Sequence, residues 1–140
     1  MSGRCFTYGS LMWADIMARV CGYNPDSRPA TLPGYTRHPV RGEDYPAIAP
    51  DDNGEVHGQL YAGIQASAWE RLDAFEGNQY ERQLVNVVLP DGSRLDAWTY
   101  VFRPQYRSLL QTGDWDVEAF RRDGKRRFEA RYLGFRQIQQ

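Results

Sequence analysis

The sequence predicts an α+β fold, in which about five to seven short strands form a small closed or nearly closed β-barrel beside two or three helices. Residues 80–89 and 94–102 are rich in β-branched and aromatic residues and flank the turn sequence PDGS, which is typical of a β-hairpin. Residues 56–61 alternate in hydrophobicity, as a half-buried strand does. Ser67 and Glu70 have the spacing of a capping box, which opens a helix. Short, numerous strands favour closure because a barrel exposes no strand edge.

The amino-terminal elements are a strand and a short helix. Residues 4–8 are aromatic and β-branched enough to form a strand, which ends at the Gly-Ser pair of residues 9–10. Asp15 is expected to cap a helix over residues 16–21. Gly22 is expected to close that helix.

The next segment, residues 23–54, is dense in proline, glycine and aspartate. It is expected to hold short strands near residues 30–37 and 45–49, with turns between them. The strand over residues 56–61 follows. One of its faces carries Val56, Gly58 and Leu60, and the other carries His57, Gln59 and Tyr61.

Two helices are expected in the rest of the chain. The helix that begins near Ser67 places Ala68, Leu72 and Phe75 on one face, and Gly77 ends it. The carboxy-terminal segment 116–135 is amphipathic. Its apolar positions, spaced as on one helix face, are Phe128, Tyr132 and Phe135.

The composition fits a single domain over residues 1–140, with 41% hydrophobic and 14% aromatic residues and a formal charge of −1. This composition excludes a disordered chain. Cys5 and Cys21 are expected to be buried, reduced thiols of a cytoplasmic protein rather than a disulfide. No apolar run is long enough to span a membrane, and the first residues lack the pattern of a signal peptide, so no membrane partner is expected.

Positive charge gathers in a carboxy-terminal tail of about residues 116–136. A basic segment can bind nucleic acid or anionic lipid. Here the acids Asp123 and Glu129 lie among the arginines, which favours a solvated helix face. No nucleic-acid partner is therefore expected.

Glu76 stands at an unusual position, because it is the last residue of its predicted helix, where the helix dipole is negative. Asp73 adds like charge one turn earlier. Moving a carboxyl pKa from about 4.3 to about 7 takes roughly 3.7 kcal/mol, and the helix end supplies about a quarter of that at most. Burial in an apolar pocket would supply the rest and make Glu76 a proton-transfer group. The alternative is a surface carboxylate at an unfavourable position.

The residues Tyr8, Gly9, Ser10 and Leu11 lie where the first strand gives way to a helical segment. A glycine there allows close backbone approach to a ligand, and free amides near a helix start can hold a carboxylate or an oxyanion. The alternative is a plain tight turn with a buried tyrosine.

Three further residues are candidates for the same site. Tyr80 and Arg82 point the same way from the strand that follows Glu76. Arg82 could pair with a substrate carboxylate or with a structural acid such as Asp73. Tyr106 follows a proline that ends a strand, so its hydroxyl is expected at a cavity mouth or its ring at the rim.

The sequence contains no arrangement typical of nucleophilic or phosphate-binding enzymes. His38 and His57 have no evident nucleophile, and neither a G-x-S-x-G elbow nor a phosphate-binding glycine loop occurs. Two His and two Cys at unrelated spacings predict no metal site. What remains is acid–base chemistry on one carboxylate, with no cofactor and no metal.

Six short segments together resemble the gamma-glutamyl cyclotransferase-like family. They cover most of residues 5–106 in the family's order, and the pair YGSL and LDAFEG is the most specific. The matching segments are FTYGSLM at 6–12, LPGY at 32–35, YPAI at 45–48, VHGQLY at 56–61, LDAFEG at 72–77 with Tyr80 and Arg82, and RPQY at 103–106.

The resemblance implies a small mixed barrel flanked by helices, with one pocket that binds a small gamma-glutamyl substrate. Glu76 would be the general acid/base, the loop of residues 8–11 would grip the gamma-glutamyl group, and Tyr106 would be a further pocket residue. The implied reaction releases 5-oxoproline and a free amine or amino acid. Alternatives are another amide or amine transfer in the same pocket, or a non-catalytic module that binds a gamma-glutamyl or amino-acid ligand.

Overall fold

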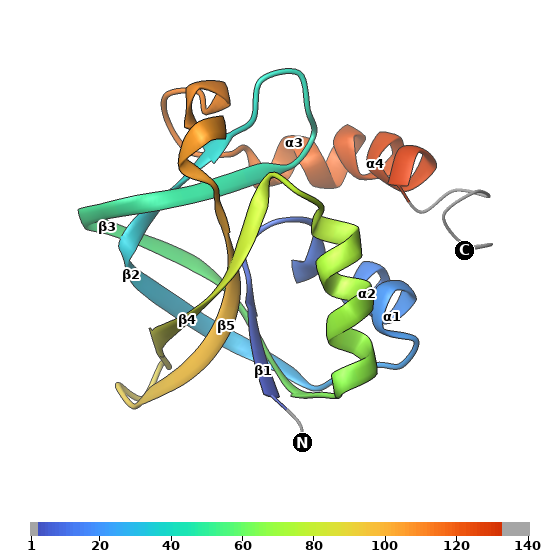
Figure 1. The fold of residues 1–140 in the computed structure, drawn as a ribbon, viewed down its shortest axis with the longest axis vertical. Helices are drawn as coiled ribbons and strands as arrows, with labels where there is room; N and C mark the ends of the chain where they lie inside the picture. Colours follow the sequence, from blue (N-terminus) through green and yellow to red (C-terminus); the bar gives the residue numbers. More distant parts are fainter. Residues whose placement is uncertain (1–2, 133–140) are drawn as a thin grey trace.

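The computed structural model describes residues 3–132 and shows a closed barrel of five strands in the order β1-β3-β2-β4-β5 (Figure 1). Neighbouring strands are antiparallel except β1 and β5, which close the barrel as a parallel pair. The predicted α+β class and mixed barrel are therefore confirmed. The strands are β1 (Gly3–Thr7), β2 (Ser27–Pro39), β3 (Pro46–Ile64), β4 (Tyr80–Val88) and β5 (Arg94–Phe102).

The helices pack outside the barrel, with α1 and α2 side by side along one side and α4 near one end (Figure 1). The predicted carboxy-terminal helix is a succession of helical pieces up to Tyr132, and its predicted continuation through Phe135 lies outside the described residues. The helical segments are α1 (Ala14–Cys21), α2 (Ala66–Glu76), α3 (Val117–Ala119), a π-helical turn (Phe120–Gly124) and α4 (Lys125–Tyr132), with 3-10 turns at Ser10–Met12 and Pro104–Leu109.

The second and third strands are much longer than predicted. Residues 45–49 and 56–61 were expected as separate strands, but residues 46–49 and 56–61 all belong to β3, which pairs with β2 from Ser27 to Pro39. A register shift between Pro33 and Tyr35 lets the pairing continue past Gly34. The predicted hairpin of β4 and β5 is confirmed.

Both predicted helix caps were wrong, because each helix begins before the residue proposed to cap it. Trp13 precedes α1, so Asp15 is a residue of its first turn, where it accepts a hydrogen bond from Lys125 Nζ at 2.8 Å. Gln65 precedes α2, Ser67 lies inside the helix, and no side-chain cap forms. Gln65 is the one residue between β3 and α2, so it occupies the cap position in place of Ser67. The glycines predicted to follow α1 and α2 do so.

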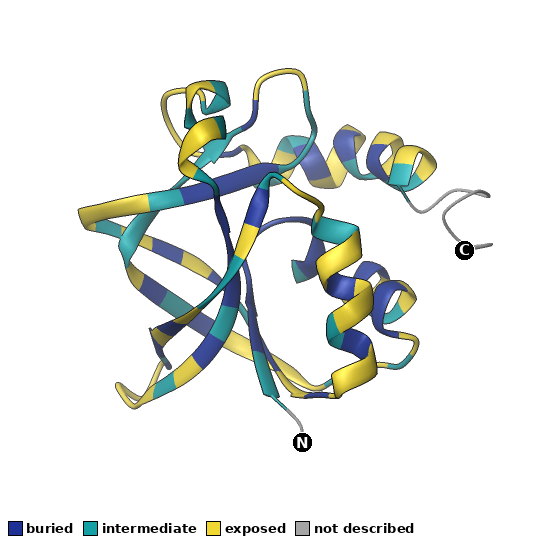
Figure 2. Ribbon diagram, in the orientation of Figure 1, coloured by how far each residue is buried: buried dark blue, intermediate teal, exposed yellow. Residues whose placement is uncertain are grey.

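Buried side chains form two clusters, one inside the barrel and one between its wall and the helices. Figure 2 shows buried residues interspersed with exposed ones along the strands and along α1 and α2. Along β3, Val56, Gly58 and Leu60 are buried as predicted. Tyr61, expected on the polar face, is also buried, because the helices cover the outside of the barrel there; its hydroxyl donates to Leu11 O at 2.8 Å. Cys5 and Cys21 are buried free thiols, as expected. No described helix is long and apolar enough to cross a membrane.

Candidate active site

One pocket lies where the end of β1, the start of β4 and the end of α2 meet, with α4 along its wall. Its enclosed volume is about 70 Å³, and it is partly open to solvent. Six of the residues predicted for the site line it: Tyr8, Gly9, Ser10, Leu11, Glu76 and Tyr80. These residues come from segments about seventy positions apart in the sequence, so the fold brings together what the motifs suggested separately.

Glu76 is the one carboxylate among the described residues that line this pocket, and no Lys, Arg or His accompanies it there. It is the last residue of α2, as predicted, and Gly77 ends the helix with its N–H bonded to Asp73 O. Burial, and to a lesser extent the charge of Asp73, raises the pKa of Glu76 to about 8. A carboxyl with that pKa can both give and take a proton near neutral pH.

Asp73 is held beside Glu76 by two partners from the barrel. Tyr100 Oη donates to its Oδ1 at 2.6 Å, and Arg82 Nε lies 3.1 Å from the same oxygen. The guanidinium of Arg82 also stacks over the rings of Trp69 and Trp98. Arg82 therefore forms the structural ion pair with Asp73, and it is not among the residues that line the pocket.

The loop over residues 8–11 is fixed from outside the pocket by Arg37. Arg37 Nη1 donates to Tyr8 O at 2.8 Å, while Nε and Nη2 bind the two carboxylate oxygens of Asp114 at 2.7 and 3.0 Å. Within residues 3–132, the N–H groups of Gly9, Ser10 and Leu11 donate no hydrogen bond to another residue. The loop thus offers unpaired donors at the pocket, as an anion-binding turn requires.

Gly9 is needed here because of its neighbour in the fold. A Cβ atom added at Gly9 would lie 2.9 Å from ring carbons of Pro46. Pro46 in turn accepts a hydrogen bond from Tyr80 Oη through its carbonyl at 2.8 Å. Burial raises the pKa of Tyr80 well above its ordinary value, so the phenol stays neutral and keeps this bond. The loop, β3 and β4 are therefore coupled by close packing at the pocket.

Tyr106 is the other predicted site residue that the fold does not bring to the pocket. It lies in the 3-10 turn after β5, with its ring centroid 6.1 Å from that of Phe102. Sequence reasoning also missed part of the lining. The pocket residues not predicted are Tyr45, Pro46, Phe75, Tyr100, Phe128 and Tyr132, together with Phe6 and Thr7 of β1.

Two of the missed residues had a usable signal. Phe128 and Tyr132 were predicted to share an apolar helix face, and both line the pocket. The helical spacing of apolar residues predicts which residues share a face, but it does not show that this face forms a pocket wall. Among residues 3–132, no group of three or more His, Cys, Asp or Glu side chains could hold a metal ion.

The protein is thus a closed mixed barrel whose pocket holds a carboxyl of raised pKa beside a loop with unpaired amides. A sequence model of the family described as gamma-glutamyl cyclotransferase, AIG2-like, matches residues 5–117. The chain belongs to this family.

Relatives of known sequence and structure agree with this assignment. An AIG2-like protein A of Arabidopsis thaliana is 36% identical over 124 residues, covering 88% of this chain and 74% of its own length. A solution structure of another Arabidopsis thaliana protein, 33% identical, superposes with a TM-score of 0.70 over 94% of this chain and 88% of its own. A solved gamma-glutamyl cyclotransferase shares the fold, at 18% identity and a TM-score of 0.67 over 78% of this chain and 76% of its own.

Proposed function

We propose that this protein is a gamma-glutamyl cyclotransferase that converts a gamma-glutamyl amide to 5-oxoproline and a free amine. The observation that supports this most is Glu76, an enclosed carboxyl whose pKa is raised to about 8, in the pocket where the 8–11 loop offers free amides. The reaction needs one group that moves a proton and donors that bind a carboxylate or an oxyanion. The pocket supplies both.

The proposed reaction begins inside the substrate. The nitrogen of its alpha-amine attacks the carbonyl carbon of its own gamma-amide and closes a five-membered ring. Because nucleophile and carbonyl belong to one molecule, holding the folded conformer removes much of the entropic barrier. The alpha-amine has a reference pKa of about 8, which matches that of Glu76, so transfer between them is nearly balanced in energy.

Glu76 would carry the proton through both halves of the reaction. As the new C–N bond forms, the attacking nitrogen gives a proton to the Glu76 carboxylate. As the tetrahedral intermediate collapses, the bond from the carbonyl carbon to the departing nitrogen breaks, and Glu76 returns the proton to that nitrogen. Bonds and protons balance without water, an electron carrier or a covalent enzyme intermediate, so we propose a reaction that requires no cofactor.

The loop over residues 8–11 would bind the glutamyl end of the substrate. Its free N–H groups suit the alpha-carboxylate, or the oxyanion that develops on the gamma-carbonyl oxygen. Arg37 fixes the loop through Tyr8 O, and Tyr80 fixes it through Pro46. Arg82 would act indirectly, because its ion pair with Asp73 holds that carboxylate near Glu76.

The test is release of 5-oxoproline from a panel of gamma-glutamyl amines and dipeptides. The Glu76→Gln variant should bind these substrates but turn them over about 10²–10⁴-fold more slowly. Glu70→Gln is the matched control, since Glu70 lies on the same helix and is exposed. Retained turnover in Glu76→Gln would refute the proposed mechanism. Binding without turnover by the wild-type protein would instead identify a gamma-glutamyl binding module.

A further inference from the structure

Helix α4 takes part in the pocket although it follows the segment that the family model matches. The matched residues end at 117, whereas Phe128 and Tyr132 of α4 both line the pocket. The side chain of Phe128 is buried, and that of Tyr132 is partly so. Part of the pocket wall therefore depends on this chain's own carboxy-terminal helix.

The two residues belong to an aromatic wall of four side chains, defined by Tyr45, Phe75, Phe128 and Tyr132. The ring centroids of Phe128 lie 5.8 Å from Phe75, 6.5 Å from Tyr45 and 4.8 Å from Tyr132. Tyr45 and Tyr132 are 5.9 Å apart. Three separate segments thus contribute to one continuous apolar surface of the pocket.

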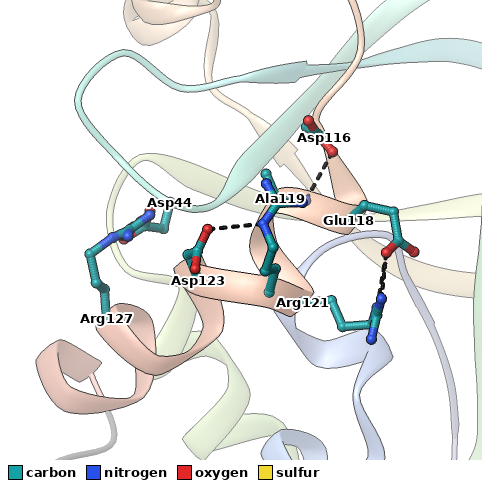
Figure 3. Close-up of polar contacts among 8 residues, drawn as sticks. Asp44, Asp116, Glu118, Ala119, Arg121, Asp123 and Arg127 are labelled. Carbon is teal, nitrogen blue, oxygen red and sulfur yellow. Dashed lines mark hydrogen bonds and ion pairs between the residues drawn. The ribbon is translucent and has the colours of Figure 1, made fainter.

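Ion pairs fasten α4 to the loop that carries Tyr45. Arg127 Nη2 donates to Asp44 Oδ1 at 2.7 Å, and Figure 3 shows the two side chains facing each other. Arg131 Nη1 donates to Glu43 Oε1 at 3.0 Å, and Tyr132 Oη donates to the same oxygen at 3.2 Å. Asp44 and Glu43 are thereby both paired with arginines of the same helix, which leaves Glu76 as the one carboxylate without a basic partner among the described residues that line the pocket.

We propose that the aromatic wall binds the leaving amine and selects gamma-glutamyl amides whose amine carries an uncharged, apolar group. This inference rests on the proposed function. The polar groups of the glutamyl part and of the reacting amide match the loop amides and Glu76. The rest of the lining is largely aromatic, so an apolar group gains burial there. A charged group would lose hydration at the wall, where the neighbouring acids Asp44 and Glu43 already pair with arginines and Glu76 is engaged at the reacting amide.

The test compares two substrates of nearly equal shape, the gamma-glutamyl amides of hexylamine and of 1,5-diaminopentane. They differ at the far end, where one has a methyl group and the other an ammonium. Wild-type protein should prefer the hexylamide by about tenfold or more in kcat/KM, and Phe128→Ala should remove most of that preference, chiefly by raising KM for the hexylamide. Arg126→Ala, an exposed change on the same helix, should leave the preference intact.

Two further measurements keep the result interpretable. Tyr132→Ala tests the wall at a less buried position, in case Phe128→Ala fails to fold. Calorimetric binding of both amides to Glu76→Gln measures the wall without turnover. Equal binding of the two amides, or a preference that survives both alanine substitutions, would overturn the proposed wall. Selective binding without release by wild-type protein would support the wall and refute the cyclotransferase reaction.

Discussion

Replacing Glu76 by glutamine should change how the stability of the folded protein depends on pH. The carboxyl has its ordinary pKa of 4.5 in the unfolded chain and a pKa of about 8 in the folded protein. The folded state therefore binds the proton more tightly, and ionisation of Glu76 opposes folding. Glutamine keeps the shape of the protonated acid but cannot ionise.

The magnitude follows from the difference between the two pKa values. At 1.36 kcal/mol per pKa unit, the shift from 4.5 to about 8 corresponds to about 5 kcal/mol. This contribution is fully present below pH 4.5, is lost progressively as the pH rises, and is gone above pH 8. Relative to Glu76→Gln, the wild-type protein should therefore lose about 5 kcal/mol of unfolding free energy between pH 4.5 and pH 9.

The assay is urea denaturation of both proteins at several values across this range. Other groups contribute too: the pKa values of Asp15 and Asp114 are lowered in the folded state, which weakens both proteins equally on acidification. Only the difference between wild type and variant reports on Glu76. The unfolding free energy of Glu70→Gln, an exposed change on the same helix, should vary with pH as that of wild type does. If the unfolding free energy of Glu76→Gln also varies with pH as that of wild type does, the Glu76 carboxyl is not buried as described.

Two substitutions test the close packing around the pocket. Gly9→Ala places a Cβ 2.9 Å from the Pro46 ring, so it should lower the free energy of unfolding by about 1–3 kcal/mol. Its Tm should fall and its KM for the substrate should rise. A variant with the Tm and KM of wild type would contradict the coupling of the loop to β3. Gly58→Ala would place a Cβ against the backbone carbonyl oxygen of Thr7 in the barrel wall, a contact that no side-chain movement relieves. That variant should fail to fold, and a native circular dichroism spectrum with an unchanged Tm would show the description of the β1–β3 pairing to be wrong.

Much of the barrel could be predicted because its local signals agree with its tertiary structure. The PDGS turn and its two flanking apolar runs specify the β4–β5 hairpin almost alone. The long hairpin of β2 and β3 was predicted only in fragments, since its prolines and glycines resemble turns. Those residues lie within strands that pair over a long distance, and composition does not report such pairing. The helix caps failed for a similar reason, because the preceding chain path, not the best capping residue, decides where each helix begins.

The candidate site was predicted unevenly. The position of Glu76 at a helix end indicated a raised pKa, but the decisive contribution is burial, which depends on side chains from α4 and β3 far away in the sequence. Arg82 was ambiguous because an arginine can serve a ligand or a neighbouring acid equally well, and here it pairs with Asp73. The aromatic wall was beyond prediction, because a helical period shows which residues share a face and not what that face contacts.

The hairpin of β2 and β3 also bears on how copies of the protein avoid adhering to one another. In the described part of the chain, β1 pairs with β3 only over residues 59–64, and β4 pairs with β2 at Thr31. Within residues 3–132, the outer half of the hairpin pairs with other backbone only near its tip, where Val40 bridges Leu110 and the Gln111 N–H bonds to Pro39 O, so most of its two edges are free. Such free edges are templates for strand addition by another chain. This half carries Pro33, Pro39, Pro46 and Pro50, and a proline has no N–H to offer an incoming strand. The prolines that obscure the strands in the sequence thus interrupt the rows of donors on which intermolecular sheet growth, and so aggregation, would depend.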